Sequence, residues 1–260
     1  LLVTGIDSNS LYRGIGNGQF KDVSSTSGIL NEHWSTGAAL GDFNADGLID
    51  IYLTNYVLYN KKARTFEANS GFKATKNIHF DHSLYNAEPN RLYINQGELR
   101  FTDLAIELNV SNPSGRSLGA KWLDINDDKW LDLIVINDHS SSNKLFLNNK
   151  GKSFTSAGNN YAPFEIDGAH DLQVIDFNNN GHDDYLMTRG NNYPTVLLSK
   201  KNHESSTVSI DQPLFSDIAR AAGITSARNL PFMSWAVSPG DFNNDGFQDF
   251  YISNGSTVVD

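Results

Sequence analysis

Four short segments of the chain carry side-chain oxygens at the same spacing. Each has Asp or Asn at positions 1, 3, 5 and 9, counted from its first Asp, and a residue at position 7 that can offer its backbone carbonyl. A hard divalent cation such as calcium takes about six to eight oxygen ligands, and a tight loop supplies them from alternate positions. The sequence therefore predicts one calcium site per segment, about four in the chain. The predicted ligands are Asp42, Asn44, Asp46, Leu48 and Asp50 in loop 1 (42–50); Asp124, Asn126, Asp128, Trp130 and Asp132 in loop 2 (124–132); Asp176, Asn178, Asn180, His182 and Asp184 in loop 3 (176–184); and Asp241, Asn243, Asp245, Phe247 and Asp249 in loop 4 (241–249).

A single loop of this kind has a second interpretation, a hairpin turn surrounded by solvated acids. Four loops with the same oxygen positions favour metal binding. Glycine at position 6 permits the bend in three loops, whereas Lys129 takes this position in loop 2 and is strained there if its φ is positive. Loop 3 has Asn178 and Asn180, so we expect a lower affinity. Manganese or strontium fits the same oxygens, and magnesium fits less well because it requires tight octahedral geometry.

The charge balance is consistent with cation binding. The 260 residues include 20 Lys and Arg against 30 Asp and Glu, which gives a net charge of −10. This acidic excess opposes sequence-independent binding to nucleic acid or to an anionic membrane surface. Four bound dications would neutralise most of it. We expect the cation-free protein to be less stable, because unpaired carboxylates crowd each loop and binding to the folded state stabilises it.

Composition and motifs exclude several other chemistries. The chain has no cysteine, which excludes disulfides, zinc–thiolate sites and a thiol nucleophile. No apolar run approaches the roughly 18 residues of a membrane-spanning segment. There is no phosphate-binding loop and no nucleophile elbow, and no acid–base pair stands out among the many Asp residues. The sequence therefore predicts a protein that is not an enzyme.

The loops belong to a longer repeat. Each loop lies between two apolar strand-like segments, and a second hairpin with a Gly-containing turn precedes it. One module is thus two hairpins, or four antiparallel strands. Sheets of this kind are apolar on both faces and must stack, so the sequence predicts an all-β fold, a β-propeller of four-stranded antiparallel blades. The predicted modules span about 11–55, 91–139, 144–190 and 195–255, and 56–90 is an insertion between the second and third strands of a module.

The two ends of the chain follow the same repeat. Residues 1–18 align with 133–151, so the chain begins where another Asp-rich loop would end. It opens on Leu1 rather than Met and shows no signal peptide, and we therefore expect a processed or partial chain. Four blades could close into a ring, but open end blades would leave apolar faces in water. The prediction is that 1–260 forms one β-propeller domain or a fragment of one, with about four blades of a larger ring.

The segments "DFNADGLIDIYLTN" and "DFNNDGFQDFYISN", together with F-x-D-x-x-x-x-x-G-I from Phe20 to Ile29, resemble the FG-GAP/VCBS repeats of integrin-α-type β-propellers. More narrowly, they are similar to the cartilage acidic protein (ASPIC-UnbV-type) family. The resemblance implies a seven-bladed ring, calcium in the loop between the first two strands of a blade, and a secreted, periplasmic or cell-surface location. The chain departs from the family at Lys129, has too few modules for seven blades, and lacks the C-terminal domain that often follows.

Two functions remain open. Strands 2 and 3 of a blade join on the face opposite the calcium loops, so insertion 56–90 projects there and could bind another protein or a glycan, or hold the chain in a larger extracellular assembly. The alternative is a lyase-like enzyme acting on polysaccharide with a basic residue. We favour binding, because no acid–base constellation repeats. The residues to test for the enzyme are Arg91, Arg116, Arg189, His79 and His82.

His79 and His82 lie three residues apart in the insertion, near Asp81 and Tyr85. This spacing could give a transition-metal or substrate site. Surface histidines in a polar loop are the more common explanation.

Overall fold

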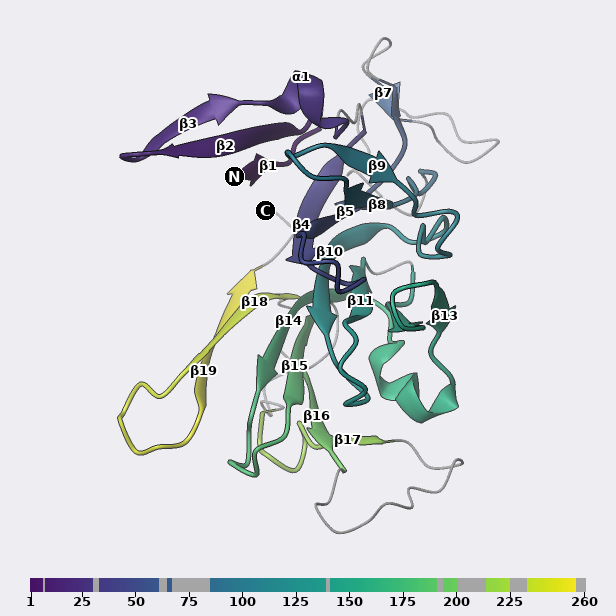
Figure 1. Ribbon diagram of the computed structural model, residues 1–260. Coiled ribbons are helices and arrows are strands. Elements are labelled where there is room, and N and C mark those ends of the chain that lie inside the picture. The colour runs from purple at the N-terminus through teal and green to yellow at the C-terminus, as the bar shows by residue number, and fades with distance from the viewer. Residues whose placement is uncertain are drawn as a thin grey trace. The chain divides into compact units, whose positions relative to one another are not determined.

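The structure is a computed structural model that describes residues 1–6, 8–29, 33–60, 65–66, 85–138, 141–190, 194–200, 214–224 and 233–255. Contacts divide the chain into two compact units, each with its own hydrophobic core. Unit 1 holds Leu1–Val135 and Lys144–Ser156, and unit 2 holds Ile136–Asn143 and Ala157–Asp260. Nearly all regular structure in both units is β-strand, which confirms the all-β prediction (Figure 1).

Unit 1 contains three antiparallel blade-like sheets. The first joins β1 (Leu2–Val3), β2 (Ser10–Gly16) and β3 (Gln19–Asp22). The second joins β4 (Ser35–Gly41), β5 (Asp50–Asn55), β8 (Arg91–Asn95) and β9 (Phe101–Asp103). The third joins β10 (Ser117–Leu123), β11 (Asp132–Asn137), β12 (Lys144–Asn148) and β13 (Phe154–Ser156), with the last two residues of β11 assigned to unit 2. Short additions are α1 (Ser24–Ser27) and the pair β6 (Tyr59–Asn60) and β7 (Thr65–Phe66).

Unit 2 contains two further sheets. A four-stranded sheet joins β14 (Ala169–Ile175), β15 (Asp184–Arg189), β16 (Thr195–Ser199) and β17 (Phe215–Asp217). A two-stranded sheet joins β18 (Met233–Gly240) and β19 (Asp249–Gly255). The 3-10 helix η2 (Asn159–Phe164) precedes β14. The four-stranded antiparallel sheets of both units are blades of the predicted propeller type.

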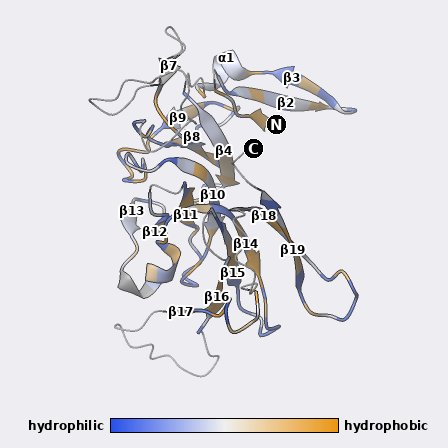
Figure 2. Ribbon diagram, turned by 180° about the vertical axis from the view of Figure 1, so that it is seen from behind, coloured by the Kyte–Doolittle hydropathy of each residue, from blue (hydrophilic) through white to orange (hydrophobic). Residues whose placement is uncertain are grey.

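The second strand of each complete sheet is the most buried. Every residue of β5 and β11 is buried, and β15 is buried up to its last residue, Arg189. A strand that packs on both faces has no solvent side, so the centre of its sequence is a continuous apolar run rather than an alternating one, as in "IYL" of β5 and "LIVI" of β11. In Figure 2 the hydrophobic segments lie along the strands, and the connecting loops are mostly hydrophilic. Among the described residues, no helix is long and apolar enough to cross a membrane.

Neighbouring sheets within a unit stack through aromatic side chains. In unit 1, Phe43 and Tyr52 of the second sheet pack against Trp122 of the third, with ring centroids 5.8 and 6.2 Å away. Phe154 of β13 lies 5.4 Å from the Phe43 ring in the same cluster. Phe177 and Phe250 of unit 2 stack at 5.9 Å. In loops 1 and 3 the aromatic residue at position 2, Phe43 or Phe177, therefore packs at the joint between two blades, whereas Ile125 takes this position in loop 2.

The hydrogen-bonded sheets begin and end at other points of the chain than the predicted modules do; we call this starting point of the repeat its phase. Each of the three four-stranded sheets begins with the strand that leads into an Asp-rich loop and ends with the Phe-containing hairpin that follows it. The predicted modules 11–55, 91–139, 144–190 and 195–255 instead combine the last two strands of one sheet with the first two of the next. The sequence repeats equally well in either phase, and only the pairing of strand 2 with strand 3 decides between them. Residues 56–90 connect strands 2 and 3 of the second sheet, since β5 pairs with β8.

The two-stranded sheet leaves exposed some residues that other repeats bury. Phe242 is 63% exposed although its equivalent Phe43 is 2% exposed, and Tyr251 is 68% exposed although its equivalent Tyr52 is fully buried. In unit 1 the third sheet covers Phe43 and Tyr52. The described residues contain no corresponding sheet against β18 and β19.

Candidate metal sites

The four Asp-rich loops occupy equivalent places in four sheets. Each joins the first strand to the second, between β4 and β5, β10 and β11, β14 and β15, and β18 and β19 (Figure 1). Strand pairing continues up to the loop, and Gly41 pairs with Asp50, for example. All twenty predicted ligands lie in these loops or at the first residue of the following strand. The sheets therefore hold both ends of each loop in a fixed register.

Hydrogen bonds close each loop in the same way, and loop 1 shows the pattern. The Asp42 carboxylate accepts the Asp46 N–H at 3.0 Å with Oδ1 and the Gly47 N–H at 2.8 Å with Oδ2. Oδ1 of Asp46 accepts the Leu48 N–H at 2.8 Å, and Asn44 Oδ1 accepts the Asp46 N–H at 3.1 Å. Loops 2, 3 and 4 repeat all four bonds. The side chains at positions 1, 3 and 5 are thereby gathered around one turn.

The backbone of the loops is left-handed at two positions. Position 6 has φ between 70° and 87°, and position 4, which the sequence analysis did not single out, has φ between 56° and 60°. The residues at position 6 are Gly47, Lys129, Gly181 and Gly246, and those at position 4 are Ala45, Asp127, Asn179 and Asn244. The expectation for Lys129 is confirmed, because its φ is +70°. A residue with a Cβ is disfavoured in this conformation by about 1–2 kcal/mol.

Reciprocal substitutions at position 6 should change stability in opposite directions. We expect Lys129→Gly to raise the free energy of unfolding by about 0.5–1 kcal/mol, since relief of strain exceeds the entropic cost of glycine. Gly47→Lys should lower it, and the cause is φ alone, because no atom lies within 4 Å of a Cβ built at Gly47. Urea unfolding in chelator measures both. A less stable Lys129→Gly variant would show that the lysine side chain makes a compensating contact.

In loops 1, 2 and 3 the Asp at position 9 is buried and ties the loop to the sheet. Asp132 is fully buried; its Oδ1 accepts the Asn148 N–H of β12 at 2.7 Å and its Oδ2 accepts the Ile125 N–H of the loop at 3.2 Å. Asp184 makes the same pair of bonds to Ser199 and Phe177, at 2.8 and 3.0 Å. Position 9 thus joins the loop, strand 2 and strand 3.

Burial raises the pKa of these position 9 carboxylates. The pKa of Asp50 rises to about 6, chiefly through desolvation, and the carboxylates of Asp46 and Asp42 raise it further. The pKa of Asp132 also rises to about 6 from burial, and Asp128 and Asp124 contribute in the same direction. The mutual effect shows that positions 1, 5 and 9 share one electrostatic environment, which a divalent cation would neutralise.

The donor set fits a hard cation. Oδ2 of Asp50 is buried and finds no hydrogen-bond partner among the described residues, although the Phe43 amide is near enough to lower the pKa of this carboxyl. All side-chain donors of loops 1, 2 and 4 are carboxylate or amide oxygens, the ligands that calcium prefers. In the described part of the chain, no three His, Asp or Glu side chains lie close enough together to hold a metal ion as they stand. The loop carboxylates instead accept hydrogen bonds from backbone N–H groups of their own loop. Calcium binding would require some of these oxygens to turn toward the ion.

Two asparagines that the sequence analysis missed support the loops from strand 3. Asn95 and Asn148 end β8 and β12, and each donates its side-chain N–H to the carbonyl at position 8 of its loop, Ile49 or Leu131. Each backbone N–H binds the position 9 carboxylate. The signal in the sequence is an Asn that closes the third strand, in "RLYIN" and "KLFLN".

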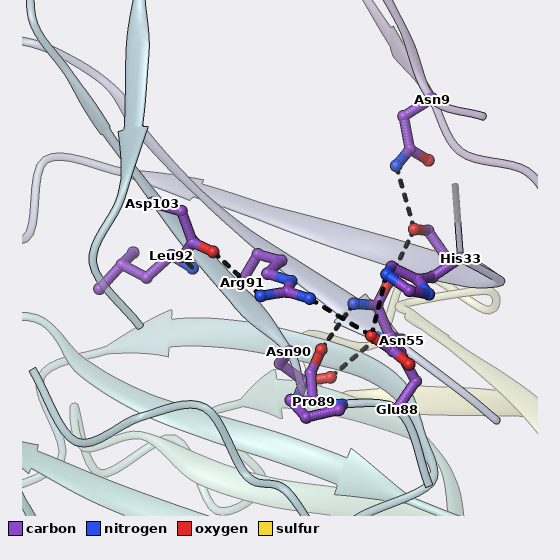
Figure 3. A network of polar contacts seen from close by, with 10 residues as sticks. Asn9, His33, Asn55, Glu88, Pro89, Asn90, Arg91, Leu92 and Asp103 are labelled. Atoms are coloured by element: carbon purple, nitrogen blue, oxygen red, sulfur yellow. Dashed lines mark hydrogen bonds and ion pairs between the residues drawn. The ribbon is translucent and has the colours of Figure 1, made fainter. Parts of the chain in front are cut away.

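The opposite end of the second sheet carries a polar network (Figure 3). The Glu88 side chain is 2% exposed, and its Oε1 lies 3.3 Å from both Arg91 Nη2 and His33 Nε2. Arg91 also pairs with Asp103 at 3.3 Å. Asn55, at the end of β5, donates its side-chain N–H to the Pro89 carbonyl at 2.7 Å. This network holds the point at which the insertion returns to the sheet.

Both ends of the insertion are fastened to each other as well as to the sheet. Val57 forms a β-bridge with Ala87, and the Glu88 N–H donates to the Tyr56 carbonyl at 3.2 Å. The Tyr56 ring packs edge-on against Trp34 at 5.0 Å. We call this arrangement of 55–58 and 86–91 the neck of the insertion.

The basic residues considered for an enzyme are distributed over both units. Arg91 belongs to the network above, and Arg116 donates to the Tyr85 carbonyl in unit 1. Arg189, in unit 2, donates to the Asp167 carbonyl at 3.2 Å. His79 and His82 lie outside the described residues. Each of the three arginines binds a backbone carbonyl or a carboxylate of its own unit.

Comparison with known proteins agrees with the repeat seen in the sheets. A family model described as an FG-GAP-like repeat matches residues 1–53, 124–187 and 176–252, which together cover more than half of the chain. The matched ranges contain all four loops. A search of curated proteins finds no match.

Proposed function

Because this chain belongs to the FG-GAP-like repeat family, we propose that it is a calcium-stabilised β-propeller module that binds another protein or a glycan. The proposal includes a location outside the cytoplasm (secreted, periplasmic or cell surface), because FG-GAP repeats are typical of extracellular proteins. The closer relation to the cartilage acidic protein family, and the seven-bladed ring, remain predictions.

The division of the second sheet into two chemically different ends carries this proposal. The oxygen-rich loop 1 joins β4 to β5 at one end of the strands, and the neck of the insertion lies where β5 ends and β8 begins. Buried Glu88 and Asn55 hold the neck, so it is part of the rigid sheet. A long connection on a rigid base is a common place for recognition, because the scaffold does not need to change when the connection does.

Binding accounts for the arginines better than polysaccharide cleavage does. A catalytic base needs access to substrate and a pKa suited to proton transfer. Arg91 is shared between two carboxylates, and Arg116 is 8% exposed and bound to a backbone carbonyl. These contacts support structural roles, and we therefore propose a module without enzymatic activity of its own.

The test of the binding function is removal of the insertion above its neck. Replacing 61–84 by a short Gly-Ser linker retains Val57, Ala87 and Glu88 and should leave the unfolding midpoint within a few degrees of the unmodified chain. We expect the unmodified chain to bind one member of a panel of purified anionic and neutral polysaccharides and extracellular matrix proteins, and the shortened chain to lose that binding at least tenfold.

A matched control removes carboxylates at the other end of the sheet. Asp42→Ala changes loop 1 and leaves the insertion intact, so with calcium in excess at the remaining loops it should bind the same partner. If the shortened chain binds the partner as tightly as the unmodified chain, the recognition surface does not include residues 61–84. Failure of the unmodified chain on the whole panel, or cleavage of a polysaccharide during the assay, would overturn the binding proposal.

A further inference from the structure

The turn between β12 and β13 connects loop 1 with loop 2. Asn148, at the end of β12, is 4% exposed, and its Nδ2 donates to the Leu131 carbonyl of loop 2 and to the Phe43 carbonyl of loop 1, both at 2.9 Å. Its Oδ1 accepts the Gly151 N–H at 2.8 Å, and its own N–H binds the Asp132 carboxylate at 2.7 Å. One buried side chain is therefore bonded to both candidate metal loops.

Gly151 gives an independent indication of the same contact. A Cβ built at this residue would lie 2.9 Å from Asn44 Cα in loop 1 and 3.1 Å from the ring of Trp130 in loop 2. The turn thus fills the space between position 3 of one loop and position 7 of the other. With φ at +72°, Gly151 also takes a conformation that suits glycine.

The preceding sheet contains a matched turn without this connection. Asn95 bonds to Ile49, to Gly97 and to Asp50, as Asn148 bonds to Leu131, to Gly151 and to Asp132. A Cβ at Gly97 would meet no atom within 4 Å, and its φ is +87°. Among the described residues Asn95 therefore bonds to its own loop and its own turn alone, and the bond to Phe43 distinguishes Asn148.

We propose that Asn148 couples cation binding at loop 1 to cation binding at loop 2. The inference rests on the proposed binding of calcium by these loops. An ion that fixes loop 1 also fixes the Phe43 carbonyl and hence Asn148, whose side chain is bonded to position 8 of loop 2 and whose backbone N–H is bonded to position 9. The second ion then binds to a loop that is already ordered, so it loses less conformational entropy. Coupling between sites is reciprocal, and loop 2 must favour loop 1 by the same factor.

The experiment measures calcium affinity at each loop of the 260-residue chain by NMR. The amide signals of Gly47 and Lys129, which bind the position 1 carboxylates, report on loops 1 and 2 separately. Asp42→Ala disables loop 1, and we expect it to weaken calcium binding at loop 2 by about fivefold or more. In an Asn148→Ala background this weakening should disappear, and in an Asn95→Ala background it should persist.

Each possible result decides a separate statement. No calcium-dependent shift at either amide would overturn calcium binding itself. Shifts at both amides with no effect of Asp42→Ala on loop 2, or with the same effect in the Asn148→Ala background, would overturn the coupling and leave calcium binding intact. If Asn148→Ala does not fold, Asn148→Asp replaces it, because it keeps an acceptor for Gly151 and loses both donated bonds.

Discussion

Removing calcium with a chelator is expected to lower the thermal unfolding midpoint of this chain by about 10 °C or more. A ligand at one hundred times its Kd stabilises a folded protein by about 2.7 kcal/mol per site, and each compact unit holds two loops. A change of 1 kcal/mol moves the midpoint of a protein of 150–250 residues by roughly 2–4 °C. In the absence of calcium, the carboxylates that raise the pKa of Asp50 and Asp132 remain uncompensated.

Differential scanning calorimetry with millimolar calcium and with chelator measures this shift, and elemental analysis gives the number of ions bound. We expect about four calcium ions per chain, with loop 3 the weakest because Asn180 stands at position 5, where the other three loops have Asp. If the midpoints with calcium and with chelator are equal and no metal is bound, the loops are hairpin turns surrounded by solvated acids and not calcium sites. The blade fold would be unaffected by that result, because it rests on strand pairing.

Asp132→Asn is expected to destabilise the protein by about 1–3 kcal/mol although it barely changes the shape of the side chain. Both carboxylate oxygens accept backbone N–H groups, from Asn148 and Ile125. An amide has only one oxygen, so one of these two backbone N–H groups would face the side-chain NH2 of the new asparagine and lose its acceptor. Asp128→Asn is the matched control, since position 5 is exposed, and in chelator it should change stability by less than about 0.5 kcal/mol. Urea unfolding of both variants in chelator tests the difference; equal effects would contradict it.

The same variant should change the pH dependence of the cation-free protein. The pKa of Asp132 is about 6 in the folded state, and it is near 4 when the chain is unfolded. Between these values the folded state holds a proton that the unfolded state has lost, so this group makes the free energy of unfolding fall as pH rises from about 4 to about 6. Asp132→Asn cannot ionise and should reduce that slope.

The repeated loops and strand patterns were sufficient to predict the blades. Asp, Asn and Gly at fixed positions mark a turn whose geometry depends on neighbours a few residues away, and "DIYLTN" or "DLIVIN" marks a strand buried on both faces. The predicted penalty at Lys129 followed from the same local argument. Such features depend on sequence separations of less than ten residues, and one sequence shows them directly.

The interactions that lie far apart in sequence were not predictable in this way. Asn148 and Phe43 are 105 residues apart, and nothing in "KLFLNN" distinguishes this asparagine from Asn95 in "RLYINQ". The phase of the sheets was unpredictable for the same reason, because it depends on which strands pair across the insertion. The burial of Glu88 was also missed, since an acid within a polar insertion gives no sign of the arginine and histidine that meet it in the fold.

The phase of the sheets determines where this protein can be divided. A fragment that begins at Ser117 and ends after Ser156 contains the whole of β10–β13, whereas one cut at 91–139 would separate β8 and β9 from β5 and leave β11 without β12. Limited proteolysis should accordingly release fragments whose ends fall in the connections from β9 to β10 or from β13 to β14. For the same reason, a duplication or deletion that keeps complete sheets preserves the pairing of strand 2 with strand 3 within each remaining sheet, and one that follows the predicted modules breaks it.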